Sequence, residues 1–228
     1  MSNNYIQVGS VPAFGPGAQP QTGGPQGDAY VSEWHGNRAA ATRAGKLFHG
    51  CGVVAGNAFP IYTTTAPLFC LWNTGPNNVE LVRFTAGYVS GTTVAGPYGY
   101  QFIPNCAAAG NGATGGQYLT AFNSVPKAVI PGLIGSGAAS TCLFSNAATN
   151  TITSAGEAIA IVNYIPGNMS TQIIESSATA GTTVIEEVFN GDIIIPPNTF
   201  FYPVGLVASV GLFNMRLTWI ETPVTTGY

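Results

Sequence analysis

From Lys46 to its end, the chain consists of short runs of β-branched and aromatic residues separated by glycine, proline and asparagine. Helical periodicity is nearly absent from this part of the sequence. Repeated short strands with turns between them indicate an antiparallel β-sandwich or barrel, and we expect about eight to ten strands. The runs that we expect to form strands are 46–55, 59–64, 67–72, 78–90, 97–104, 125–134, 157–165, 182–189, 192–195, 199–204 and 206–221.

The segment CLWNTGPNNVELVRFTAGYVSGTT, residues 70–93, predicts a strand, a turn, a second strand and a second turn. In the second strand, Val79 and Leu81 share one face. The apolar alternation then continues in the opposite phase through Val82, Phe84, Ala86 and Tyr88. A phase change within a strand indicates one extra, unpaired residue, so we expect a β-bulge near Leu81 to Arg83.

The last expected strand, 206–221, separates an apolar face from a polar one. One face carries Phe213, Met215, Leu217 and Trp219, and the other carries Asn214, Arg216 and Thr218. This alternation predicts one side toward a core and one toward solvent. A strand of this length would extend about 50 Å, so we expect it to bend at Gly211 or to span two sheets. The region 105–155 is rich in small residues and predicts long loops, which are often contact surfaces.

The N-terminal part of the chain has a different composition. Residues 1–27 are rich in glycine, proline, glutamine and asparagine and offer little to bury, which is typical of an extended arm or of a plain disordered tail. Asp28 is a possible N-cap and Gly45 a possible C-terminal stop, but Gly36 interrupts the segment between them, so we expect only a short helix at about 37–44. We therefore expect two parts, an arm with a short helix over 1–45 and a β-sandwich over 46–228.

Charge is unusually scarce. The 228 residues include 6 Lys and Arg and 9 Asp and Glu, which is 7% charged against about 25% in an average protein. A folded monomer of 23.4 kDa exposes roughly 9,700 Å². So few charges, with a net charge of only −3, give weak protection against self-association. We therefore expect much of the exterior to be buried against other subunits.

The sequence argues against two classes of partner, nucleic acids and membranes. Binding to nucleic acid needs clustered basic residues, and the tightest group here is Arg38, Arg43 and Lys46, which is more typical of a solvated helix end or a subunit contact. No apolar run reaches the roughly 18 residues that cross a bilayer. The first residues also lack the pattern of a secretory signal. We expect synthesis in a cytoplasm.

The residues that carry most enzyme chemistry are few and poorly arranged. The four cysteines, at 51, 70, 106 and 142, form no CxxC pair, so we expect reduced thiols and neither a metal site nor a redox motif. His49 and Cys51 are two residues apart and would share a strand face, as a base and a thiol nucleophile do. No third group that would orient them is apparent in the sequence. Ordinary packing is the better interpretation for this pair.

Other candidate groups also favour simpler interpretations. His35 lies near Glu33. The adjacent carboxylates Glu186 and Glu187 would point to opposite faces of a strand, which does not suit the pair of a glycosidase. We therefore expect no catalytic, cofactor-binding or metal-binding residues, no cofactor and no enzyme activity.

Two aromatic segments leave a second interpretation open. The runs GPYGYQF, residues 96–102, and TFFYPVG, residues 199–205, offer rings that would stack on sugars if they were exposed. Aromatic residues in strands are more often core. If Tyr98 and Tyr100 lie on the surface, we expect saturable binding of a host glycan, lost when they are mutated.

The runs VSEWHGNRAAATRAGKLFHG, CLWNTGPNNVELVRFTAGYVSGTT and FNMRLTWIETPV together resemble structural proteins of tailed bacteriophage particles. The resemblance runs from about residue 30 to the end and lies in turn and strand patterns. It implies a jelly-roll-like sandwich and a non-enzymatic virion component, such as a capsid decoration or minor head protein, commonly trimeric. The implied partners are other copies of the chain and other capsid proteins, contacted through the arm and loops. The alternative is a receptor- or glycan-binding spike or fibre head.

Overall fold

The computed structural model describes residues 22–23, 29–30, 38–94, 96–108, 118–122, 124–146, 150–152, 158–165, 184–189 and 192–224. The chain divides into two compact units, Met1–Ala39 and Ala40–Tyr228. In the first unit, β1 (Thr22–Gly23) and β2 (Ala29–Tyr30) form a short antiparallel pair. Most of the expected arm, including Asp28, Glu33 and His35, lies outside the described residues.

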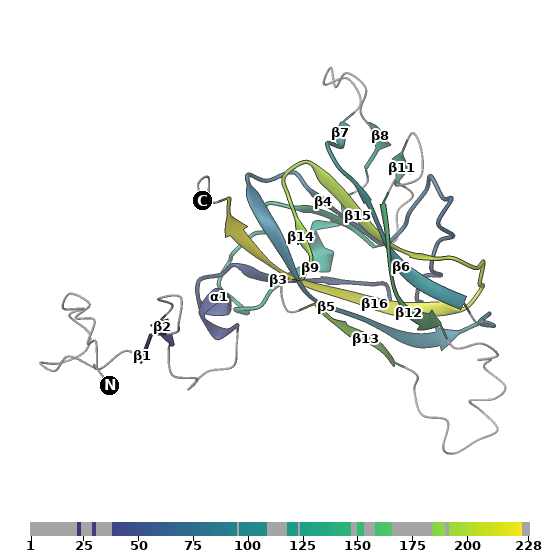
Figure 1. The fold of residues 1–228 in the computed structure, drawn as a ribbon, viewed down its shortest axis with the longest axis horizontal. Helices are drawn as coiled ribbons and strands as arrows, with labels where there is room; N and C mark the ends of the chain where they lie inside the picture. The colour runs from purple at the N-terminus through teal and green to yellow at the C-terminus, as the bar shows by residue number, and fades with distance from the viewer. Residues whose placement is uncertain are drawn as a thin grey trace, which may run out of the picture. The chain divides into compact units, whose positions relative to one another are not determined.

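The second unit is an antiparallel β-sandwich, as the strand pattern predicted (Figure 1). One sheet has the order β13-β5-β16-β3-β9, with β14 also paired to β5. Its strands are β3 (Leu47–Cys51), β5 (Asn77–Ser90), β9 (Val129–Pro131), β13 (Val184–Val188), β14 (Ile194–Ile195) and β16 (Leu212–Pro223). We call it the six-stranded sheet.

The second large sheet has the order β10-β4-β15-β6-β12. Its strands are β4 (Cys70–Asn73), β6 (Gly96–Ile103), β10 (Leu143–Ser145), β12 (Ala158–Ile165) and β15 (Thr199–Gly205). We call it the five-stranded sheet. From β3 to β6 the long strands alternate between the sheets. The chain then stays in the five-stranded sheet for β12 before it alternates again through β13, β15 and β16.

The region 105–155 contains more regular structure than the predicted loops. Besides β9 and β10, it includes β7 (Ala107–Ala108), β8 (Tyr118–Ala121) and β11 (Thr151–Ile152), which form a small sheet, and a 3-10 helix at Pro126–Ala128. Phe122 and Ile152 pack on the outer side of the five-stranded sheet, against Trp72 and Phe200. Every residue of β15 is therefore buried. Small residues weaken a strand signal, but pairing with neighbouring strands supplies what the local sequence lacks.

The main core fills the space between the two large sheets. The six-stranded sheet contributes Phe84, Met215 and Trp219, and the five-stranded sheet contributes Tyr100 and Phe201. The rings meet mostly edge to face, as Phe84 and Tyr100 do at a centroid distance of 5.6 Å. Such contacts contribute roughly 0.5–1.5 kcal/mol beyond the burial of the rings.

The predicted bulge is present in β5. Thr218 of β16 pairs with Arg83 and Trp219 pairs with Leu81, which leaves Val82 as the extra residue. The predicted position of Val82 on the same face as Phe84 is wrong. Val82 packs instead in a small outer cluster with two neighbouring strand residues and a residue of the helix, namely Leu47, Ile220 and Ala41. The bulge thus lets β5 bury residues on both of its faces.

The helix α1 spans Ala39–Arg43, within the predicted 37–44. It ends as predicted at Gly45, which has a φ of 68°. Gly45 donates its N–H to the carbonyl of Thr42, and Lys46 donates to that of Ala41. Glycine is favoured here because other residues rarely adopt a positive φ.

Three expected strands differ clearly from the structure. Of residues 125–134, only Val129–Pro131 form a strand, because Pro126–Ala128 form a 3-10 helix. Residues 59–64 form no strand, only an isolated bridge between Ile61 and Gly205. Pro60 has no N–H to donate to a ladder, although its carbonyl accepts a hydrogen bond from Gly205. The final strand begins at Leu212 rather than at 206, because 206–211 form the turn from β15 into β16. Its predicted faces are correct, except that Thr218 on the outer face is also buried.

The contact between Gly50 and Phe144 gives a test of the packing. A Cβ at Gly50 would lie 2.5 Å from the Phe144 ring, whereas a Cβ at Gly87 would meet nothing within 4 Å. We expect Gly50→Ala to lower the free energy of unfolding by about 1–3 kcal/mol, because the ring must shift within a packed core. The matched change Gly87→Ala, in the same sheet, should be neutral or slightly stabilising. Urea unfolding of both variants measures the difference, and equal stabilities would contradict this packing.

Candidate functional site

The outer face of the six-stranded sheet brings together the only histidine among the described residues and several charged groups. Across the sheet, Ile130 pairs with His49, His49 with Thr218, and Thr218 with Arg83. The Nδ1 atom of His49 lies 3.0 Å from the Oγ1 atom of Thr218. Partial burial, together with the charge of Arg216, lowers the pKa of His49 from 6.5 to about 4. His49 is therefore neutral near pH 7.

The geometry gives little support to a nucleophilic pair of His49 and Cys51. Both lie on the outer face, where Cys51 pairs with Arg216 in the ladder. A base with a pKa of about 4 is a poor acceptor for a thiol proton. Burial raises the pKa of Cys70, and burial with the nearby charge of Glu221 raises that of Cys142, so both stay protonated thiols. Within the described ranges, no three His, Cys, Asp or Glu side chains are grouped as metal ligands would be.

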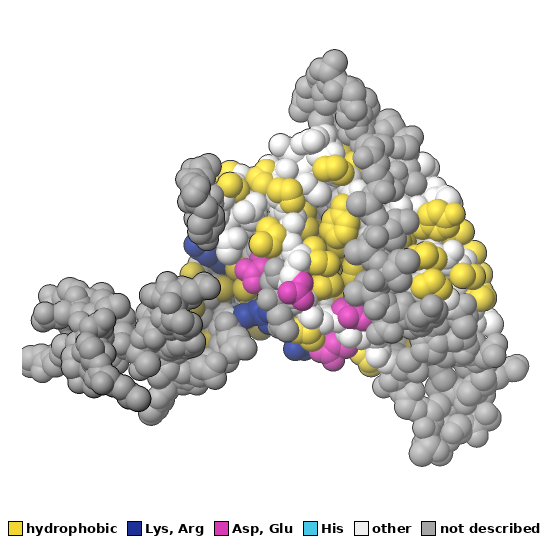
Figure 2. All heavy atoms as spheres, viewed as in Figure 1, with side chains coloured by type: hydrophobic (Ala, Val, Ile, Leu, Met, Phe, Trp, Pro, Cys, Tyr) yellow, Lys and Arg dark blue, Asp and Glu magenta, His cyan; other side chains and the backbone are white. Residues whose placement is uncertain are grey.

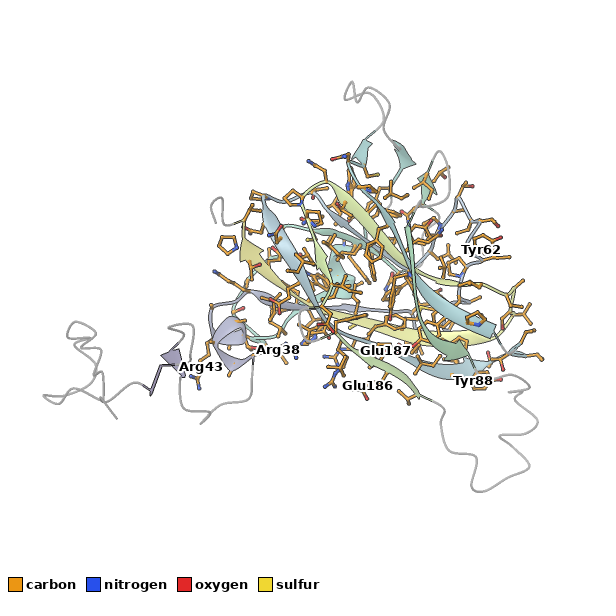
Figure 3. All side chains as sticks on the ribbon, viewed as in Figure 1. Arg38, Arg43, Tyr62, Tyr88, Glu186 and Glu187 are labelled. Atoms are coloured by element: carbon orange, nitrogen blue, oxygen red, sulfur yellow. The ribbon has the colours of Figure 1, made fainter. Side chains whose placement is uncertain are left out.

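Glu186 and Glu187 point to opposite faces of β13, as predicted (Figure 3). Glu186 forms an ion pair with Arg83, with 3.2 Å between Oε1 and Nε, and both side chains are about half exposed. Glu187 accepts a hydrogen bond of 2.8 Å from the hydroxyl of Tyr98 in the five-stranded sheet. The two carboxylates therefore cannot flank one bond of a substrate.

The aromatic segments that might have bound sugars are core. Tyr98 and Tyr100 are fully buried, as are all residues of 199–205. The favoured interpretation of these residues as core is therefore confirmed, and the alternative of a surface for stacking on a glycan is wrong. Burial raises the pKa of Tyr98, and its hydrogen bond to Glu187 raises it further. Among the aromatic residues whose exposure the structure describes, Tyr62 is the one that is well exposed.

A buried carboxylate supports one end of the sandwich. Glu221, near the end of β16, accepts hydrogen bonds from the hydroxyls of Ser140 and Thr141 and from the N–H of Thr141. The indole N–H of Trp219 also points to it at 3.4 Å. Ser140 and Thr141 belong to the loop before β10, so Glu221 holds that loop against the sheet. Its hydrogen bonds are internal, which is typical of a structural role.

Charged side chains occupy only part of the sandwich. Where the structure describes them, they lie on α1, on the 3-10 helix, on strands of the six-stranded sheet and on the connections between these elements. The strands of the five-stranded sheet contain no charged residue. In Figure 2, the blue and magenta side chains gather toward the lower left and centre, whereas yellow side chains dominate the right. The charged residues that the structure describes are therefore distributed unevenly over the sandwich.

Comparisons with known proteins gave no match to a protein-family model, a curated protein or a solved structure. The resemblance to bacteriophage structural proteins therefore remains a prediction. Among the described residues, no helix is both long enough and apolar enough to cross a membrane.

The hydrogen bond between Tyr98 and Glu187 can be tested against a matched tyrosine. Tyr98→Phe should lower the free energy of unfolding by about 1–2 kcal/mol, because Glu187 loses a donor in a partly buried position. The buried hydroxyl of Tyr100 has no hydrogen-bond partner among the described residues. Tyr100→Phe should therefore be neutral or stabilising. Thermal or urea unfolding distinguishes the two, and a larger loss for Tyr100→Phe would contradict the assigned contacts.

The depressed pKa of His49 predicts a dependence of stability on pH. The folded state binds the proton more weakly than the unfolded chain, so stability present above about pH 6.5 is lost as the pH falls toward 4. His49→Gln should remove the part of this loss that occurs between pH 7 and pH 5, a range above most carboxylate titrations. Urea unfolding at several pH values measures it. An unchanged pH profile in the variant would show that His49 is not responsible.

Proposed function

We propose that this protein is a non-enzymatic structural component of a bacteriophage virion, a capsid decoration or minor head protein that acts as a homo-oligomer. One observation carries the proposal: the exterior combines very few charges with large exposed apolar side chains. Val54, Ile134 and Val210 are 90%, 85% and 70% exposed. A chain with 7% charged residues is poorly protected against association, so a role within an assembly suits it.

The strand order supports the proposal. Numbered along the chain, the eight main strands are β3, β4, β5, β6, β12, β13, β15 and β16. One sheet then contains strands 1, 8, 3 and 6 side by side, and the other contains 2, 7, 4 and 5. We interpret this order as a jelly roll, an architecture found in viral capsid proteins and also in lectins. Because one fold serves many functions, the order supports the class without fixing it.

In this proposal, the N-terminal arm and the loops contact neighbouring subunits, and the trimer is the favoured state. The partners are other copies of the chain and other capsid proteins. The protein is synthesised in the host cytoplasm and resides in the virion. No step of the proposed role needs a cofactor or a catalytic residue.

The proposal is tested with the full-length protein and with capsids prepared without it. We expect purified protein to form trimers and to attach to these capsids, and electron microscopy of particles to locate it in the map. A variant that lacks residues 1–30 should attach more weakly, because it lacks most of the arm. A freely soluble monomer at high concentration, for which residues 1–30 are dispensable, would overturn the proposal.

The alternative is a receptor- or glycan-binding spike or fibre head. Tyr62, which is 41% exposed, is the observation that favours it, since an exposed ring can stack on a sugar. Calorimetric titration with host polysaccharide tests this alternative. Saturable binding that Tyr62→Ala abolishes and Tyr98→Phe preserves would support it over the first proposal.

A further inference from the structure

Three connections meet at one end of the sandwich. They are residues 52–66 between β3 and β4, 91–94 between β5 and β6, and 206–211 between β15 and β16. We call these residues the loop end. Val94 donates its N–H to the hydroxyl oxygen of Ser209 at 3.2 Å, which joins the second connection to the third. Tyr62 donates its N–H to the carbonyl of Gly205 at 3.1 Å, which joins the first connection to β15.

The loop end exposes apolar side chains from all three connections. In addition to Val54 and Val210, its exposed large apolar residues are Ile61, Tyr62, Val94 and Val207. Figure 3 labels Tyr62 at the right of the view, and Figure 2 shows yellow side chains in the same area. None of the residues in the three connections is charged. A group of exposed apolar residues on adjacent loops is unusual on a monomer and marks an interaction surface more often than isolated residues do.

Close packing and hydrogen bonds fix the backbone of the loop end. Gly56 and Gly91 have φ values of 78° and 88°, which other residues rarely adopt. A Cβ at Gly91 would lie 2.5 Å from the carbonyl oxygen of Val210, so the second and third connections pack closely. Asn57 and Phe213 exchange backbone hydrogen bonds of 2.8 and 2.9 Å, which hold the first connection to the start of β16. A surface that is already ordered loses less entropy when it binds a partner.

The absence of charge from the three connections restricts the partner. A charged surface placed here would lose its hydration without finding an opposite charge, which is costly. An uncharged, apolar surface is therefore the complementary one. A second copy of this chain offers such a surface, because its own loop end has no charges that would repel the first. Other exposed apolar residues fit less well, since Val184 and Val188 lie on β13 with Glu186, beside Arg83.

We propose that the loop end is the surface through which copies of this chain bind one another. The inference rests on the proposed function in that it names the surface of the expected homo-oligomer. It does not depend on attachment to a capsid. The interface would be predominantly apolar, so added salt should not dissociate it, in contrast to an interface of ion pairs.

The test replaces the most exposed residues of the loop end in the full-length protein. Val54→Asp together with Val210→Asp would place unpaired carboxylates in the interface, and we expect the dissociation constant for self-association to rise by roughly a hundredfold or more. Ile134→Asp is the matched control, because Ile134 is 85% exposed but lies outside the loop end. Analytical ultracentrifugation over a concentration series measures the mass of each protein. Circular dichroism and thermal unfolding check that each variant remains folded.

Each outcome decides the inference. An oligomer that the double variant dissociates, and that the control and high salt leave intact, supports it. A monomeric wild-type protein overturns it, as does a folded double variant with unchanged mass. These results are separate from those for the proposed function. An oligomer that does not attach to capsids would support the loop end as an interface and would overturn the virion role. Attachment to capsids by a monomer would overturn the loop-end interface and the homo-oligomer but would keep the virion role.

Discussion

Aromatic packing between two uncharged inner faces is the interaction on which the rest of this structure depends. Phe84 and Trp219 from the six-stranded sheet meet Tyr100 and Phe201 from the five-stranded sheet in one continuous core. Rings are large, so a modest number of them can join two sheets. The fit is close enough that Gly50 is required where the Phe144 ring crosses β3. Both the exposed loops and the charged face are positioned by this core.

The two sheets differ in what covers them. In the five-stranded sheet, the strand β15 is buried on both sides, because Phe122 and Ile152 pack over the outer face. The six-stranded sheet presents much of its outer face to solvent and carries Arg83, Glu186 and Arg216 there. The connections at the loop end belong to neither face and carry no charge. This unequal distribution of the described charges links the fold to the proposed assembly, since the three uncharged connections are the part most in need of a partner.

Sequence reasoning succeeded where one local signal dominated. The bulge in β5 followed from a change of apolar phase, and the helix end followed from Gly45. Predictions from the sequence were wrong where the partner of a residue lies far away in the chain. The strands β7, β8 and β11 were missed because they lie in a region of small residues with weak propensity. The burial of Tyr98 and Tyr100, in contrast, agrees with the preference of strand aromatic residues for the core. Pro60 was misplaced in a strand because its position against Gly205 depends on a contact across the fold.

The sequence by itself determined the class of fold, the turns between strands and the shortage of charge, because alternation, glycine positions and composition are local or additive properties. Only the tertiary structure decided which aromatic residues are core and which apolar residues meet at the surface. Val54, Val94 and Val210 are separated by long stretches of sequence, and each alone is an ordinary exposed valine. They become one surface because β3 and β5 both pair with β16, and because this sheet packs against the sheet that contains β15. Both the pairing and the packing are set by contacts between residues far apart in the chain.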